Sequence, residues 1–390
     1  MRAAYVAVVA VSGGLLLATS ALGAELDPAL ARLVVAQECH AQPGPDGRLT
    51  EHVGRIVDDE ATRQSIADKY TALGLPRSEG LCIADDVAFK KLVSEWGFAL
   101  APNGTYAART TGYGGFNVGL QASYTTIDHN ASFWRLGTEG ARGADGASPS
   151  GGRPPALVSQ YSLNIRKNFG LGFEALANVG FVPASSIING GLDLRLSLLE
   201  GFRTGVGGVL PDLSIGGGVR TITGTPQLQL TTVAVDARIS KPIVIASSSV
   251  LTPIVGYQYV WVFGRSGVID LTPATDPLEY CGFAGTAIPR GDGSSAAPDG
   301  QVVCSGGTIL DFNNDQVFEE ANLKRQRLLF GLNYRYENLT TGVNLVTDLF
   351  DPADVQTNER DKRALSTCNG DDCSSMGRQW QLNVEAGFAF

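Results

Sequence analysis

Histidine is the first residue to examine for catalysis, and the chain has three: His40, His52 and His129. His129 follows Asp128 and precedes Ser132 in the stretch DHNASFW. A catalytic histidine needs one group that orients it and another that reacts with the substrate. Asp128 and His129 would point to opposite sides of a strand, and the stretch is predicted to be a loop. We therefore expect no catalytic residues and no enzymatic activity; hydrolysis that depends on His129 is the weaker alternative.

Metal binding has one candidate pattern, and it lacks two of the residues that it needs. The stretch DFNNDQ at 311–316 begins like a calcium-binding loop. The glycine expected at the sixth position is Gln316, and the glutamate expected at the twelfth is Asn322. The cysteines also lack the CxxC spacing of a zinc site. We expect no metal and no cofactor.

Charged side chains alternate with apolar ones through most of the chain and could line an aqueous path. Both signs of charge are present, so the same side chains could instead pair and fill the interior as a polar core. The candidate lumen-lining residues are Arg166, Glu174, Asp193, Arg195, Arg220, Asp236, Arg238, Arg335, Asp348 and Glu385.

The elements that must position these residues are β-strands, because from Tyr113 the hydrophobic pattern has a period of two. In GLDLRLSL, for example, Leu192 and Leu194 alternate with Asp193 and Arg195. About ten such segments follow one another to the end of the chain. Short turns alternate with long polar connections at 129–155, 264–322 and 351–375. This pattern is typical of a transmembrane antiparallel β-barrel, here of about ten strands within a range of 8–14.

The first part of the chain has a different pattern. Residues 1–24 contain one charge, Arg2, then an apolar stretch and small residues, which indicates a signal peptide that is removed. Residues 25–95 are predicted to be a helical segment in the periplasm, with helices over 26–40, 58–75 and 85–96. Residues 96–112 would be a linker or a partial strand, and residues 113–390 the barrel.

Six cysteines in an exported chain favour disulfides. Six cysteines allow fifteen pairings. The simplest pairing joins neighbours in the sequence: Cys39 with Cys82, Cys281 with Cys304, and Cys368 with Cys373.

The last eleven residues, WQLNVEAGFAF, form an alternating strand that ends on phenylalanine. This strand resembles the assembly signal of Gram-negative outer-membrane β-barrel proteins. The matching positions are Trp380, Leu382, Val384, Phe388 and Phe390. The resemblance implies insertion into the outer membrane by the barrel-assembly machinery, with lipid around the apolar face. If the last strand ends in the periplasm, the three long connections lie outside the cell.

Composition and pattern leave two functions open. A barrel of this size could be a narrow channel for small solutes or have another envelope transport role. The alternative is a non-conducting structural or surface-binding barrel whose outer loops contact an extracellular partner. The net charge of -9 argues against a nucleic-acid partner. A secreted β-sandwich is the competing fold, and the sequence leaves the ligand and the oligomeric state open.

Overall fold

The computed structural model describes residues 25–35, 83–140, 154–200, 210–270, 281–283, 302–304, 315–351 and 376–390. The predicted signal peptide, the predicted helix over 58–75, and Cys39, Cys82, Cys368 and Cys373 lie outside these ranges.

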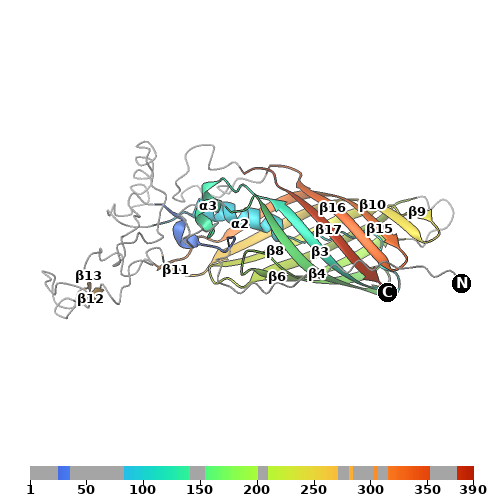
Figure 1. Cartoon of the computed structure of the whole chain (residues 1–390), viewed down its shortest axis with the longest axis horizontal. Helices are drawn as coiled ribbons and strands as arrows, with labels where there is room; N and C mark the ends of the chain where they lie inside the picture. Colours follow the sequence, from blue (N-terminus) through green and yellow to red (C-terminus); the bar gives the residue numbers. More distant parts are fainter. Residues whose placement is uncertain are drawn as a thin grey trace, which may run out of the picture.

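Within the described residues, ten strands close into one antiparallel barrel (Figure 1). Each strand pairs with its neighbours in the chain, and the ring closes where the last strand, β17, pairs with the first, β3. The ten strands are β3 (Phe116–Thr126), β4 (Leu157–Gly170), β5 (Phe173–Phe181), β6 (Ile188–Leu199), β7 (Asp212–Thr223), β8 (Leu228–Ser240), β10 (Ser249–Ser266), β15 (Ala321–Tyr336), β16 (Leu339–Asp348) and β17 (Trp380–Ala389). The predicted fold and strand number are confirmed.

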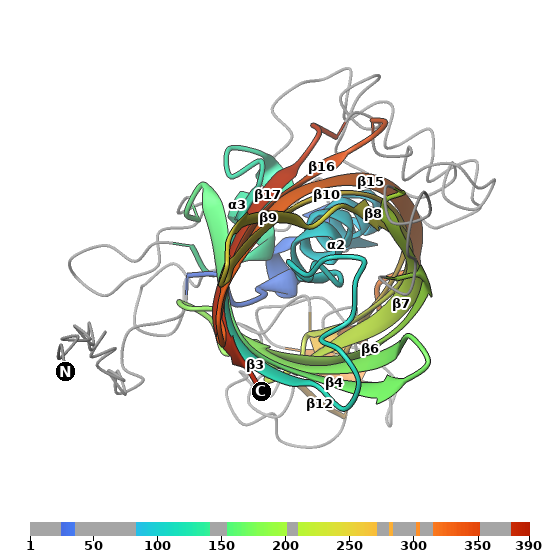
Figure 2. The same ribbon diagram turned by 90° about the vertical axis from the view of Figure 1, so that its right-hand side faces the viewer.

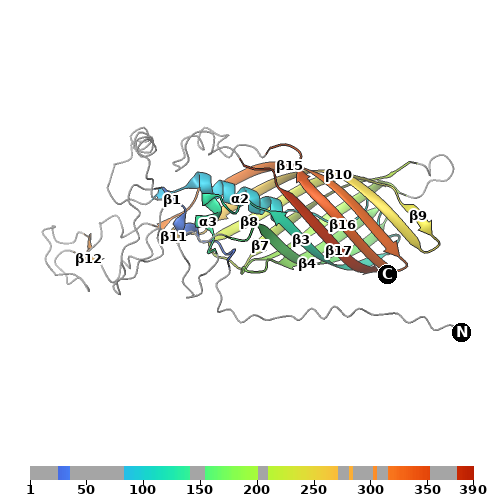
Figure 3. The ribbon, with the colours of Figure 1, turned by 45° about the horizontal axis from the view of Figure 1, so that its top comes forward.

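The two ends of the barrel differ. The long connections β3–β4, β10–β15 and β16–β17 all leave from one end, which we call the loop end. The C-terminal end carries Phe390, whose backbone exchanges hydrogen bonds of 3.0 and 2.7 Å with Phe116 at the start of β3. At this end β9 (Ile243–Ala246) pairs with β10 and extends the sheet past the end of β8 (Figure 3).

Most of the strands separate an apolar outer face from a largely polar inner face. In β6 the outward Leu192 and Leu194 are 59% and 54% exposed, whereas the inward Asp193 and Arg195 are 6% and 5% exposed. Leucine, valine and phenylalanine continue this outer face around the ring. A closed sheet satisfies all backbone hydrogen bonds without water, and an apolar outer wall of this size is stable in lipid.

Smaller elements occupy the loop end: η1 (Leu30–Arg32), β1 (Val34–Val35), β2 (Ile83–Ala84), α2 (Asp86–Leu100), α3 (Ser132–Gly137), β11 (Ile269–Asp270), β12 (Cys281–Phe283), β13 (Val302–Cys304) and β14 (Asp315–Gln316). None of the described helices is long and apolar enough to cross a membrane. Strands β12 and β13 pair with Cys281 opposite Cys304, a register that suits the predicted disulfide, since directly opposed Cα atoms lie about 4.5–5.5 Å apart. The disulfide itself stays a prediction.

The N-terminal segment differs in part from the expectation. Where a helix was predicted over 26–40, the described residues form only the short turn η1, and then Val34 and Val35 pair with β2; β-branched residues favour such pairing. Residues 96–112, expected to be a linker or a partial strand, are the last turn of α2 followed by an irregular segment.

Candidate functional site

Helix α2 lies inside the barrel, not in a separate periplasmic segment (Figure 2). It begins with Asp85, whose carboxylate accepts a hydrogen bond of 2.9 Å from the backbone N–H of Ala88, a standard N-terminal cap. It ends before Pro102, which cannot continue a helix. From there residues 101–115 run down the lumen to β3 at the C-terminal end. We call α2 and residues 101–115 together the plug.

The plug closes the loop end of the lumen with an apolar core. Phe89, Leu92 and Trp96 of α2 have no exposed surface, and they belong to one cluster with the inward-facing Val260 and Val262 of β10. The alternating pattern predicts a polar inner face and therefore could not predict this core. In part of β10 both faces are apolar, and the strict alternation is lost there. Water is excluded where these side chains meet.

Two glycines allow this close contact. A Cβ on Gly97 of α2 would lie 2.3 Å from Val262 Cγ1, and a Cβ on Gly264 of β10 would lie 2.4 Å from Val93 Cγ1. Real Cβ atoms do not approach so closely. Glycine at both positions therefore lets helix and wall pack at backbone distance.

Two buried arginines of β15 hold α2 from the other side. Arg327 donates to the carbonyls of Phe98 at 2.9 Å and Pro102 at 2.7 Å, which satisfies acceptors at the helix C-terminus. Arg325 donates to the Ser94 carbonyl at 3.0 Å and forms a double contact with Asp348. Neither arginine is more than 3% exposed.

Further down, Tyr106 of the plug is enclosed by arginines of the wall. The guanidinium carbons of Arg195, Arg238 and Arg166 lie 3.9, 4.5 and 5.2 Å from the centre of its ring. Its hydroxyl donates to Asp193 at 2.9 Å, and Asp193 in turn accepts from Arg220 at 2.9 Å.

Wall arginines also bond the plug backbone beside Tyr106. Arg238 donates to the carbonyl of Gly104 at 2.6 Å, and Arg195 donates to that of Ala107 at 2.9 Å. Asp236 lies between these two arginines, 2.9 Å from Arg238 and 3.6 Å from Arg195. The charges of the wall are therefore engaged with the plug and with one another.

The structure brings most predicted lumen-lining residues to the plug. Arg166, Asp193, Arg195, Arg220, Asp236 and Arg238 surround Tyr106. Glu174 accepts from the backbone of Thr111, and Glu385 accepts from Thr105. Asp348 lies near the loop end with Arg325, and Arg335 lies exposed at the C-terminal rim. Their predicted role in lining a solute path stays a prediction.

Sequence reasoning missed the plug residues and half of β15. Arg325 and Arg327 belong to the run LKRQR, which has the composition of a loop, although they alternate correctly with Lys324 and Gln326. That alternation was the available signal. Tyr106 and Asn103 precede the first strand, and nothing in the local pattern marks them as luminal.

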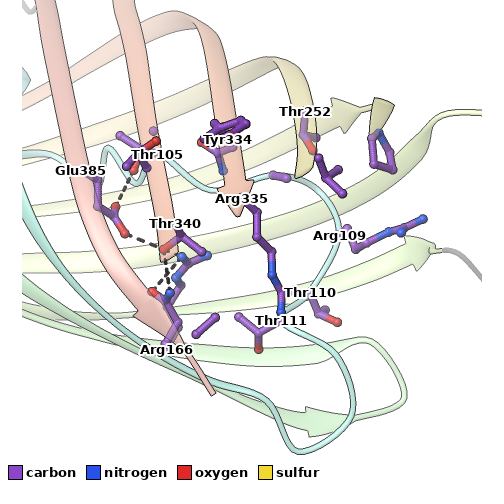
Figure 4. A pocket seen from close by; sticks show the side chains of 18 residues that line it. Thr105, Arg109, Thr110, Thr111, Arg166, Thr252, Tyr334, Arg335, Thr340 and Glu385 are labelled. Carbon is purple, nitrogen blue, oxygen red and sulfur yellow. Dashed lines mark hydrogen bonds and ion pairs between the residues drawn. The ribbon is translucent and has the colours of Figure 1, made fainter. Parts of the chain in front are cut away.

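The polar half of the lumen contains a cavity of about 190 Å³ near the C-terminal end (Figure 4). Plug residues Thr105, Arg109 and Thr111 form one side, and strand residues including Arg166 and Arg335 form the other. Asn117, Asn333, Tyr334, Thr340 and Glu385 also line it.

The residues predicted to be unsuited to metal binding or catalysis can be located in the described part of the chain. Among them, no three His, Cys, Asp or Glu side chains lie close enough to hold a metal ion. His129 is half-buried in the β3–β4 connection, and Asp315 and Gln316 of the calcium-like stretch form β14.

Glu95 links the plug to the β3–β4 connection and gives a prediction on pH. Beyond the end of β3 its carboxylate accepts from the Trp134 indole at 2.6 Å and from the backbone N–H of Asp128 at 3.0 Å. Burial raises the pKa of Glu95 from 4.5 to about 7, although both donors lower it. Between these values the native state keeps a proton that the unfolded chain has lost, so the free energy of unfolding falls as the pH rises.

We therefore expect the melting temperature to be higher at pH 5 than at pH 8, and Glu95→Gln to reduce this difference. Glutamine keeps an acceptor for Trp134 but does not titrate. Melting followed by tryptophan fluorescence at both pH values measures the effect. An identical pH dependence in the two proteins would show that Glu95 does not titrate in this range.

Comparison with known proteins gives fold likeness only. No family model and no curated protein matches the chain. The structure is similar to Ail, the attachment invasion locus protein of Yersinia pestis, at 9% identity and a TM-score of 0.23, over 72% of this chain and 100% of Ail. It is also similar to Neisserial surface protein A, at 9% identity and a TM-score of 0.23, over 71% of this chain and 99% of that protein. Likeness at this level says nothing about activity. The closed ring of strands with its apolar outer wall gives this chain the architecture of a transmembrane β-barrel.

Proposed function

We propose that the protein is a non-conducting outer-membrane barrel. At its loop end it anchors a folded cap, formed by η1, β1, β2 and α3, and this cap contacts an extracellular partner. The observation that carries this proposal is the apolar core between α2 and the barrel wall. An ion that crossed this contact would have to displace Phe89, Leu92 and Trp96, which have no exposed surface. Such a seal differs from a polar constriction, which ions can pass with part of their hydration.

The cap supports the second half of the proposal. Leu30 and Leu33 join the same core as α2 and Trp134 of α3, so the cap and the seal are one packed unit. Arg32 of η1 donates to the carbonyls of Leu136 and Thr138. A rigid surface built on the barrel mouth suits recognition more than passage. The long connections that begin at this end would extend that surface.

A narrow channel is the second candidate, and the cavity at the C-terminal end favours it. There the lumen is polar and contains an open space, so the level of α2 and the plug residues around Tyr106 are what block a continuous path. Conduction would require α2 to leave its core. This candidate therefore predicts an equilibrium between a plugged and an unplugged state.

Single-channel recording in planar bilayers tests the proposal. The full-length protein is reconstituted, and its insertion is verified by heat-modifiable migration of the recovered barrel on gels. We expect no conductance steps from the inserted wild-type barrel. Regular steps of uniform size from the wild-type protein would contradict the proposal and favour the channel.

A further inference from the structure

We propose that the cavity at the C-terminal end of the lumen binds a small water-soluble oxyanion, a carboxylate or a phosphate. This inference is independent of the proposed function, because the cavity lies on the C-terminal side of the α2 seal. It holds whether or not the loop end opens.

The lining of the cavity has an excess of positive charge. Of its 18 lining residues, three are arginines, Arg109, Arg166 and Arg335, and one is a carboxylate, Glu385. Glu385 is engaged by Arg166 at 3.6 Å and by the hydroxyl of Thr105 (Figure 4). Two of the arginines are paired with carboxylates, Arg166 with Glu385 and Arg109 with Asp212, and Glu200 and Glu174 accept hydrogen bonds from Thr110 and Thr111 of the lining. An anionic occupant is therefore favoured chiefly by Arg335.

Arg335 is the cation that remains available. It lies exposed at the rim, and its one hydrogen bond among the described residues runs from Nε to the carbonyl of Glu337 at 2.9 Å. No carboxylate of the described chain pairs with it. In Figure 4 its side chain points from β15 across the cavity toward Thr111. Arg109 lies on the plug side and is paired with Asp212 at 3.1 Å.

Hydrogen-bonding groups without partners mark the same cavity. Two potential donors of the lining, Nε of Arg166 and Oγ1 of Thr111, are buried and have no hydrogen-bond partner within the described ranges. Oδ1 of Asn333 also has no partner there, but it is an acceptor that water and not an oxyanion would satisfy. Arg166 is only 8% exposed. Buried polar atoms are normally satisfied, so unpartnered ones in a cavity indicate a bound molecule or water. Of the six threonines of the lining, Thr105 and Thr110 already donate to Glu385 and Glu200, and the hydroxyls of the other four could donate to an oxyanion.

The occupant must be small and must enter from water. A volume of about 190 Å³ accommodates a few waters or a compact organic acid, not a chain or a sugar polymer. Its lining residues lie on the plug and near the C-terminal end of the barrel wall. A free solute is therefore expected, and a lipid headgroup is not.

Isothermal titration calorimetry tests this site with the full-length protein in a non-ionic detergent at low salt. Sodium succinate and sodium phosphate are the probes, and glucose is the neutral control. We expect at least one of the two anions to bind and glucose not to bind. Arg335→Gln should weaken the binding about tenfold or more, because a hydrogen bond to a charged group is lost.

Two further variants locate the binding. Thr111→Val keeps the shape of the side chain and removes the unpartnered hydroxyl, so it should also weaken the binding. Arg265→Gln removes the same charge as Arg335→Gln from the loop end, where Arg265 is 64% exposed, and should leave the binding unchanged. The proposal fails if neither anion binds at about 10 mM, if glucose binds as tightly, or if the Arg335 and Arg265 variants behave alike.

Discussion

Replacing Gly264 by leucine is expected to unseat α2 and to make a silent barrel conduct ions. Even the first atom of the new side chain would lie 2.4 Å from Val93 Cγ1 and 2.8 Å from Val93 Cγ2. Helix α2 must then move away from β10, and the apolar seal opens on that side. Single-channel recording measures the result. Val255→Leu is the matched control, since it enlarges a side chain of the same strand on the outer face.

The smaller substitution Gly264→Ala identifies the contact. Overpacking of a well-filled core costs about 1–3 kcal/mol. Val93→Ala removes both clashing methyl groups and leaves only the Cβ, at 3.2 Å. In the double variant we therefore expect a loss of stability smaller than the sum of the two single losses. Urea unfolding from vesicles, followed by tryptophan fluorescence, measures the three values. Additive losses would show that Gly264 and Val93 do not restrict each other.

These results bear on what a channel in this barrel would require. If the leucine variant conducts and the wild type does not, the wall is a competent pore and the plug alone closes it. If neither conducts, residues 101–115 block the lower lumen without help from α2. In both cases the wall side chains act mainly by holding the plug. Most of the ten predicted lumen-lining residues, with Arg335 and Asp348 as exceptions, are therefore better understood as contacts around the plug than as the lining of a free path.

The barrel could be predicted from the sequence because the alternation of apolar and polar residues within each strand indicates which face is outward and which is inward. Leu192 and Leu194 face out and Asp193 and Arg195 face in, whatever the rest of the chain does. The period of two therefore gave the fold class, the approximate strand number and the polar interior. Closure follows from chemistry, since an open sheet would leave backbone groups unsatisfied in lipid.

The plug could not be predicted, because its position depends on contacts between distant parts of the chain. Residues 86–100 have helix-forming residues and a cap, so the helix itself was expected, but an apolar helix gives no sign of what covers it. Gly97 and Gly264 leave the space in which helix and wall meet. The partners of Tyr106 are likewise 60 or more residues away in the sequence. A strand pattern contains no information of that kind.

The largest loss of stability is expected from Asp193→Asn, at the centre of the plug contacts. Asp193 pairs with Arg220, and their side chains are 7% and 5% exposed. Asp193 also accepts the Tyr106 hydroxyl. Removing one partner of a buried pair leaves an uncompensated charge and costs about 3–5 kcal/mol. Here the remaining charge would be Arg220, in a region that already contains Arg195 and Arg238.

This account predicts a rescue that a simple loss of packing would not give. Asp193→Asn combined with Arg220→Gln removes the unpaired charge, so the double variant should regain more than half of the stability lost. Tyr106→Phe should cost about 1 kcal/mol, because the ring stays among the arginines and only its hydrogen bond is lost. Glu320→Gln breaks the exposed pair with Arg265, whose side chains are both 64% exposed, and should cost less than about 1 kcal/mol. Urea unfolding from vesicles compares all four variants. If the double variant were no more stable than Asp193→Asn, the loss would come from the geometry of Asp193 and not from its charge.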